Sequence, residues 1–85
     1  YLAWDLGEAG VRVNAISAGP VRTLAARGIP GFGTMADTIN SRTPLRREIS
    51  ADEVADTAVY LASPLSAAVT GETIFVDAGF HAMGL

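Results

Sequence analysis

The stretch VRVNAISAGPVRTLAA, residues 11–26, decides which fold this chain can adopt. Its first part, Val11 to Ile16, is rich in β-branched residues and predicts a strand. The strand is expected to end at Ala18-Gly19-Pro20, because proline fixes its own φ and has no N–H to donate. A short segment of small residues follows, for which Thr23 is a suitable N-cap. A strand that passes through a tight corner into a helix is typical of α/β proteins.

The rest of the sequence predicts a second strand and several helices. Tyr1 to Leu6 is expected to be the last part of a helix that ends at Gly7, and Thr73 to Asp77 is expected to be the second strand. Helices are predicted over residues 23–27, 32–42 and 51–62. Ser50 and Glu53 form the S-x-x-E pattern of a capping box before the last of these. The apolar stripe of this helix is predicted to consist of Val54, Ala55, Ala58, Val59 and Ala62.

The order of these elements predicts parallel strands, because the connection between the two strands is far too long for a hairpin. Parallel sheets are covered on both faces, and two strands alone do not make one. We therefore predict an α/β fold in which residues 1–85 are the C-terminal part of a larger, doubly wound parallel sheet, with two strands and their covering helices in this chain. The chain is interpreted as a fragment of a single domain.

Composition and charge argue against several classes of function. Of the 85 residues, 49% are apolar and only 18% are charged, against about 25% in typical soluble domains. The net charge of −3 gives no support for nucleic-acid binding. The absence of cysteine removes disulfides and thiol nucleophiles, and it fits a cytoplasmic location. No apolar run approaches the ~20 residues that span a bilayer, so no membrane partner is expected.

The Gly-Pro corner supports two interpretations of equal weight when spacing alone is considered. In open α/β sheets, ligands bind beyond the carboxyl ends of the strands, where Gly19 and Pro20 lie. Because Gly19 has no Cβ, a ligand could approach the backbone there, and the N–H groups of Val21, Arg22 and Thr23 would face outward toward it. In the other interpretation, the corner is only a turn that ends the strand and Thr23 is only a cap.

A resemblance favours the first interpretation. VRVNAI, the Gly-Pro corner and the nearby threonine are similar to the sixth strand and following loop of short-chain dehydrogenases/reductases. AISAGPVRTLAA, then TPLRR, then SADEVADTAVYLASPLSAAVTGETIFVDAGF, closely resemble the bacterial enoyl-acyl-carrier-protein reductases. The resemblance covers essentially all 85 residues. It implies a Rossmann-like dinucleotide-binding domain, of which this chain is the C-terminal fragment.

The same resemblance implies an activity and its partners. These enzymes reduce the trans-2 double bond of an acyl chain that is carried as a thioester on acyl carrier protein, in fatty acid biosynthesis. NADH is the expected cofactor, and NADPH is not excluded. A homotetramer in the cytoplasm is expected. The tyrosine and lysine that carry the family's catalysis precede the segment seen here, so no catalytic residue is predicted in this chain, which contains no lysine. No metal site is expected.

The resemblance also assigns candidate binding residues. Val21 is expected to bond the nicotinamide carboxamide through its backbone, and Thr23 is expected to bond the pyrophosphate. The predicted cofactor-binding residues are Gly19, Pro20, Val21, Arg22, Thr23, Leu24 and Ala25. The predicted acyl-binding residues are Ala25, Ala26, Ile29, Phe32 and Met35, in a segment expected to close over bound ligand.

Two alternatives to this activity stay open at this point. A related ketoreductase would act on a 3-oxoacyl or other carbonyl group, although such enzymes usually have Pro-Gly where this chain has Ala18-Gly19-Pro20. A non-catalytic fragment that contributes subunit contacts is the third hypothesis, because exposed apolar patches usually mark interfaces.

Three polar residues outside the corner are expected to have structural roles only. Asn14 should form a hydrogen bond within the protein, since a polar side chain in a strand needs a partner when it is buried. Asp77 is expected to shape the turn after the second strand. His81 is expected to be exposed to solvent and to be neither a base nor a ligand, since no Asp or Ser lies at a suggestive spacing.

Overall fold

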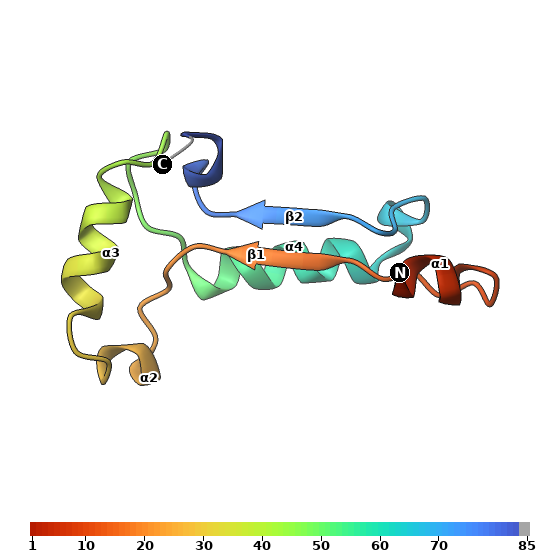
Figure 1. Ribbon diagram of the computed structural model, residues 1–85, viewed down its shortest axis with the longest axis horizontal. Helices are drawn as coiled ribbons and strands as arrows, with labels where there is room; N and C mark the ends of the chain where they lie inside the picture. Colours follow the sequence, from red (N-terminus) through yellow and green to blue (C-terminus); the bar gives the residue numbers. More distant parts are fainter. Residues whose placement is uncertain (84–85) are drawn as a thin grey trace.

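The structure, a computed structural model, describes residues 1–83 and contains four helices, two strands and two short 3-10 turns (Figure 1). The turn η1 follows α4, and η2 follows β2. In chain order the elements are α1 Leu2–Gly7, β1 Ala15–Ala18, α2 Leu24–Arg27, α3 Phe32–Asn40, α4 Ala51–Ala62, η1 Pro64–Ser66, β2 Thr73–Val76 and η2 Phe80–Met83.

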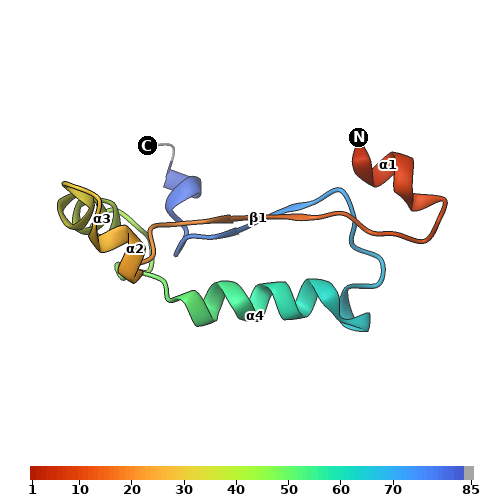
Figure 2. The same ribbon diagram turned by 90° about the horizontal axis from the view of Figure 1, so that it is seen from below.

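The two strands are parallel, which confirms the prediction from the element order. Ala15 pairs with Thr73 at one end and Ala18 with Val76 at the other. Helix α4 lies along one face of this pair, and over the other face α1 and η2 lie only toward the ends (Figure 2). The α/β fold class is therefore correct: within residues 1–83, two parallel strands are covered along one face by α4.

Strand β1 lies later in the chain than predicted. The sequence predicted residues 11–16, whereas the structure has Ala15–Ala18. The reason is that residues 12–14 pair with the segment after α4 instead of with a strand: the Val13 N–H donates to Thr70 Oγ1 at 3.1 Å, and the Gly71 N–H donates to Val13 O at 2.8 Å. β-branched composition indicates an extended backbone, but it does not say which partner will bond it.

Arg12 and Asn14 connect this extended segment to the end of α4. The Arg12 guanidinium donates to Leu61 O at 2.9 Å and to Ser66 Oγ at 3.0 Å, so it satisfies a carbonyl that the helix end leaves unpaired. The Asn14 amide donates to Val69 O at 2.9 Å and accepts from the Glu72 N–H at 3.1 Å. The structural hydrogen bond predicted for Asn14 is confirmed.

Helix α4 begins and ends at the predicted residues. Ser50 Oγ accepts from the Glu53 N–H at 3.2 Å, and the Glu53 carboxylate accepts from the Ser50 N–H at 2.9 Å, so the capping box is confirmed. Arg47 adds an ion pair to the same carboxylate at 2.7 Å. Hydrogen bonds from Arg47 and then from the Ser50 backbone lower the pKa of Glu53 to about 2.

The predicted apolar stripe of α4 is partly wrong. Val54 is half-buried, as are Thr57 and Leu61 one and two turns later, whereas Val59 is 67% exposed. Val54, Thr57 and Leu61 follow the i, i+3, i+7 spacing of one helix face, and this face includes a threonine that a hydrophobicity count passes over. The bounds of α2 and α3 are close to the predicted ones. Helix α2 starts at Leu24 instead of residue 23, and α3 ends at Asn40 instead of residue 42.

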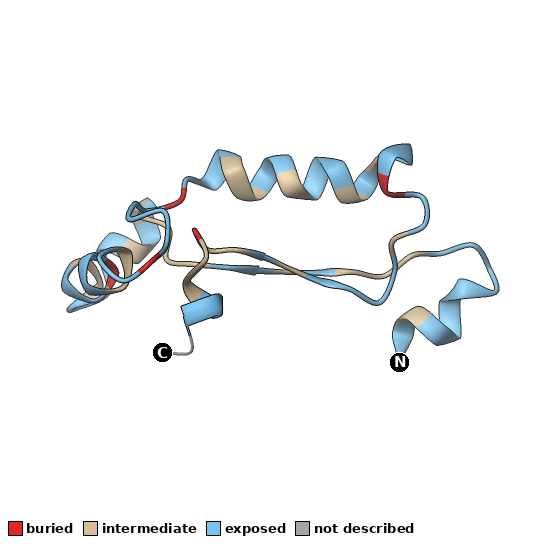
Figure 3. Cartoon of the chain, turned by 90° about the horizontal axis from the view of Figure 1, so that it is seen from above, coloured by how far each residue is buried: buried red, intermediate tan, exposed pale blue. Residues whose placement is uncertain are grey.

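The described residues enclose very little core. The buried apolar residues are Ala36, Ile49 and Ala78, and none of them lies in either strand or in α4 (Figure 3). The exposed ones include Trp4 at 87% and Phe75 at 45%. Within residues 1–83, no helix is both long and apolar enough to cross a membrane. The apolar surface of this chain therefore requires cover that the chain itself does not supply.

This exposure predicts how the isolated 85-residue chain behaves. Because so little apolar surface is buried, urea unfolding followed by circular dichroism should be broad, with an m-value below about 1 kcal/mol/M, and the chain should bind the dye ANS before urea is added. A steep, cooperative transition without dye binding would contradict the interpretation of the exposed faces as contact surfaces.

The low pKa of Glu53 predicts a pH-dependent contribution to stability. A carboxyl whose pKa is lowered on folding stabilises the fold above its unfolded pKa, and this contribution is lost as the pH falls from about 4.5 to about 2. An NMR titration of the Glu53 side-chain carbon should give a midpoint near 2, and Arg47→Met should move this midpoint upward. Arg46→Met is the matched control, since Arg46 bonds only a backbone carbonyl, that of Pro44. An unchanged midpoint in Arg47→Met would refute the assigned cause.

Candidate functional site

The segment at residues 19–23, called here the Gly-Pro loop, leaves the sheet directly at the carboxyl end of β1. The Gly19 N–H donates to Val76 O at 3.0 Å, so the parallel ladder extends one residue beyond the strand. A Cβ at Gly19 would lie 3.3 Å from both Cα and Cβ of Asp77, which is closer than an ordinary contact. The sequence analysis explained this glycine by the approach of a ligand, whereas the neighbour that the structure places there is the end of strand β2.

Two of the three N–H groups predicted to face outward have no partner within the described chain. The Thr23 N–H donates to Val21 O at 2.9 Å, so the prediction is wrong for this amide. The amides of Val21 and Arg22 form no hydrogen bond with any residue from 1 to 83, and both residues are half-buried. Because half-buried backbone donors are normally paired, these two amides are available to an acceptor from outside this segment.

Thr23 caps the helix that follows, as predicted. Its backbone is extended, with φ −90° and ψ 166°, and its Oγ1 accepts from the Ala26 N–H at 3.1 Å. A hydroxyl carries one proton of its own, so after this bond Thr23 can still donate one hydrogen bond.

An open hollow of about 540 Å³ adjoins the Gly-Pro loop. Val21, Arg22 and Thr23 line it from the loop side and Arg27 from α2. The opposite side is formed by the segment that leads into α4 and by its first turn: Arg47, Glu48, Ile49, Ser50, Ala51 and Glu53. The hollow is therefore shared by the carboxyl edge of the sheet and the N-terminus of the helix that covers it.

Arg22 is held by two carboxylates from different parts of the chain. Its Nε lies 2.6 Å from Glu48 Oε2, and its Nη2 forms an ion pair with Asp37 on α3. The hydrogen bonds that the guanidinium donates to Glu48 and then to Asp37 raise its pKa. Sequence reasoning missed both partners, which lie 15 and 26 residues away, and no local spacing in the sequence could have identified them.

The predicted acyl-binding residues lie together on α2, on α3 and on the turn between them. The Ile29 N–H donates to Ala26 O at 3.0 Å and the Phe32 N–H to Ile29 O at 3.1 Å, which keeps this segment tightly folded. Ala26 and Phe32 are half-buried, whereas Ile29 is 57% and Met35 47% exposed. None of the set lines the hollow at the Gly-Pro loop. The Leu24 side chain lies outside the described part of the chain.

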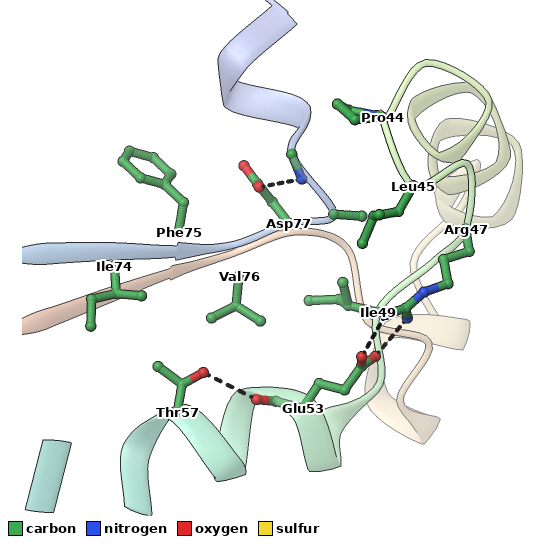
Figure 4. Close-up of a pocket in the computed structure, with 12 residues that line it drawn as sticks. Pro44, Leu45, Arg47, Ile49, Glu53, Thr57, Ile74, Phe75, Val76 and Asp77 are labelled. Atoms are coloured by element: carbon green, nitrogen blue, oxygen red, sulfur yellow. Dashed lines mark hydrogen bonds and ion pairs between the residues drawn. The ribbon is translucent and has the colours of Figure 1, made fainter. Parts of the chain in front are cut away.

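A second hollow, of about 470 Å³, lies between β2 and the start of α4 (Figure 4). Ile74 and Val76 line it from the strand, Ile49 from the connecting segment, and the Arg47–Glu53 ion pair lies at its side. It contains none of the predicted site residues.

The turn after β2 has a partner that the sequence analysis missed. Asp77 accepts from the backbone N–H groups of Gly79 and His81, each at 3.0 Å, which confirms its turn-forming role. The predicted exposure of His81 is confirmed, since 46% of its side chain is accessible, but the expectation that it has no suitably spaced Asp is wrong: its Nδ1 lies 3.2 Å from Asp77 Oδ2, and its ring is stacked on Phe75 with centroids 3.9 Å apart. The i, i+4 spacing of Asp77 and His81 was the signal that could have revealed this contact.

Comparison with known proteins identifies relatives along the whole segment. The family model described as Enoyl-(Acyl carrier protein) reductase matches residues 1–81. Two relatives are an enoyl-[acyl-carrier-protein] reductase [NADPH] FabI from Staphylococcus aureus, 58% identical over 98% of this chain, and an enoyl-[acyl-carrier-protein] reductase [NADH] FabI from Bacillus cereus, 56% identical over 99%. This chain covers 32% and 33% of their lengths, so it spans about a third of the relatives it matches.

Solved structures agree with this assignment. The crystal structure of the Bacillus cereus enoyl-acyl carrier protein reductase with NADP+ and indole naphthyridinone matches with a TM-score of 0.91 and 56% identity, over 100% of this chain and 33% of that one. The predicted Rossmann-type fold is thus confirmed. The chain belongs to the enoyl-(acyl carrier protein) reductase family.

Proposed function

We propose that this chain forms the cofactor-binding and acyl-covering third of an enoyl-acyl-carrier-protein reductase, which reduces the trans-2 double bond of an acyl thioester with NADH in fatty acid biosynthesis. The observation that carries the proposal is that the N–H groups of Val21 and Arg22, at the carboxyl edge of a parallel sheet, have no partner among residues 1–83. Relatives named for NADH and for NADPH both match this segment, so NADPH is retained as a second possible cofactor.

The residues of the Gly-Pro loop fit a nicotinamide dinucleotide. The Val21 amide is placed to donate to the carboxamide oxygen, and the Thr23 hydroxyl keeps the proton that a pyrophosphate oxygen would accept. Gly19 and Pro20 fix the corner from which these donors extend, and Arg22, Leu24 and Ala25 complete the cofactor side. When bound, the nicotinamide supplies the hydride. The loop contributes position, because donors fixed before binding do not have to reorganise.

The acyl chain is assigned to the segment that carries Ala25, Ala26, Ile29, Phe32 and Met35. The exposure of Ile29 and Met35 supports this role, because both present apolar surface that this chain leaves uncovered. Closure of the segment over the substrate would exclude water from the reacting double bond, which strengthens the electrostatic interactions there. The catalytic tyrosine and lysine are contributed from outside these 85 residues.

The assembled enzyme is proposed to be a cytoplasmic homotetramer that receives its substrate as a thioester on acyl carrier protein. Exposed apolar residues on α1 and β2, such as Trp4 and Phe75, support contacts with further protein, from the same subunit or from another. The hypothesis that this chain contributes subunit contacts is therefore compatible with the proposed activity, because the same exposed surfaces can contact other subunits of the enzyme.

A chimera tests the proposed activity. Residues 1–85 replace the matching third of the Bacillus cereus relative, and loss of reduced nicotinamide is followed with a trans-2-enoyl thioester as substrate. We expect turnover with NADH or NADPH, because 56% identity and a shared fold should preserve the site. The control is the unaltered Bacillus cereus relative. A folded chimera without enoyl reduction would refute the proposal, and a preference for a 3-oxoacyl thioester would favour the ketoreductase.

The role of the Val21 amide can be tested with a matched pair of variants in the same chimera. Val21→Pro removes the N–H, whereas Val21→Ala keeps it and shortens only the side chain. The dissociation constant for NADH should rise about two- to tenfold in the proline variant, as expected for one lost hydrogen bond, and change little in the alanine variant. Equal affinities of the two variants, measured by nicotinamide fluorescence, would show that this amide does not bind the cofactor.

A further inference from the structure

We propose that Arg22 is a positioning residue that fixes helix α3 to the Gly-Pro loop, so that the segment assigned to the acyl chain is coupled to the loop assigned to the nicotinamide. This inference rests on the proposed function. The ion-pair cluster that carries it consists of Arg22, Asp37 and Glu48, called here the Arg22 cluster.

The cluster joins three segments through one side chain. Arg22 lies in the Gly-Pro loop, Asp37 lies in the second turn of α3, and Glu48 lies in the segment before α4. The guanidinium also lies close to the start of α3, since a Cβ at Gly33 would be 3.8 Å from its Nη1. The backbone and the side chain of Arg22 thus have different roles: its N–H has no partner among residues 1–83, whereas its guanidinium donates through Nε and Nη2 to two carboxylates.

Few other contacts hold α3 in place. Its buried residue is Ala36, and its side chains Met35 and Asp37 are largely exposed. A single exposed ion pair contributes little to stability, but two carboxylates on one planar guanidinium form a network whose geometry is more closely defined. Because little apolar surface is packed beneath α3, loss of the Arg22 cluster should increase the fraction of time that the helix is detached from the Gly-Pro loop.

The arrangement predicts reciprocal coupling. If the Arg22 side chain holds α3, then detachment of α3 also frees the side chain of the residue whose amide is assigned to the cofactor. A ligand that orders the loop should therefore order α3, and weakening the attachment of α3 should lower the affinity of the loop for its ligand by the same factor. Lysine could not replace arginine here, because an ammonium group does not present the planar fork that spans two carboxylates.

Hydrogen exchange in the complete protein tests the attachment without relying on activity. Asp37→Asn and Glu48→Gln each remove one charge from the Arg22 cluster, and Arg22→Lys removes the fork. In the absence of cofactor, amides over residues 32–40 should exchange about two- to fivefold faster in each variant than in the wild type. Asp37→Glu should exchange as slowly as the wild type over residues 32–40, because it keeps the negative charge. Asp52→Asn on α4 is the matched control and should exchange like the wild type.

Enzyme kinetics separate this proposal from the proposed function. Asp37→Asn and Glu48→Gln should raise KM for the enoyl thioester about two- to fivefold with kcat nearly unchanged, since neither carboxylate is assigned to the cofactor or to the reacting atoms. Wild-type exchange over residues 32–40 in both Asp37→Asn and Glu48→Gln would overturn the positioning role, whether or not the protein is active. If exchange rises as expected but wild-type protein reduces no enoyl thioester, the attachment stands and the proposed function fails.

Discussion

The parallel pairing of two four-residue strands is the constraint on which the rest of this structure depends. Because Ala18 is in register with Val76, and the Gly19 N–H still donates to Val76 O, the chain leaves β1 at a fixed height beside the end of β2. The absence of a Cβ at residue 19 lets Asp77 approach at that point. The position of every donor in the Gly-Pro loop follows from this pairing, as does the position of the turn that Asp77 shapes on the neighbouring strand.

Local patterns predicted the elements that local interactions stabilise. The limits of α4 were correct because the Ser50–Glu53 capping box and Pro64 act within a few residues of the helix ends. The limits of β1 were wrong because they depend on Thr70 and Gly71, more than fifty residues away. The Gly-Pro loop was correctly placed at the sheet edge, but the partners of Arg22 come from two later segments that only the fold brings together.

In the Gly-Pro loop, backbone groups and side chains form different interactions. In the Gly-Pro loop the backbone offers the unpaired groups, while side chains hold the loop: Arg22 pairs with two carboxylates, and Thr23 caps α2. Polar side chains dominate these contacts because few large apolar ones are buried. The chain spans about a third of the length of its relatives, and within residues 1–83 it buries little of its own apolar surface.

One consequence follows from the bond between Thr23 and the Ala26 N–H. It uses one of the two lone pairs of the hydroxyl oxygen and leaves the hydroxyl proton free to donate, while the N–H groups of Val21 and Arg22 can only donate. Three successive residues of the loop can therefore each donate a hydrogen bond to a guest, two from the main chain and one from a side chain. Such a row of donors suits a guest whose facing edge carries lone pairs, so part of the selectivity by chemical type comes from the main chain.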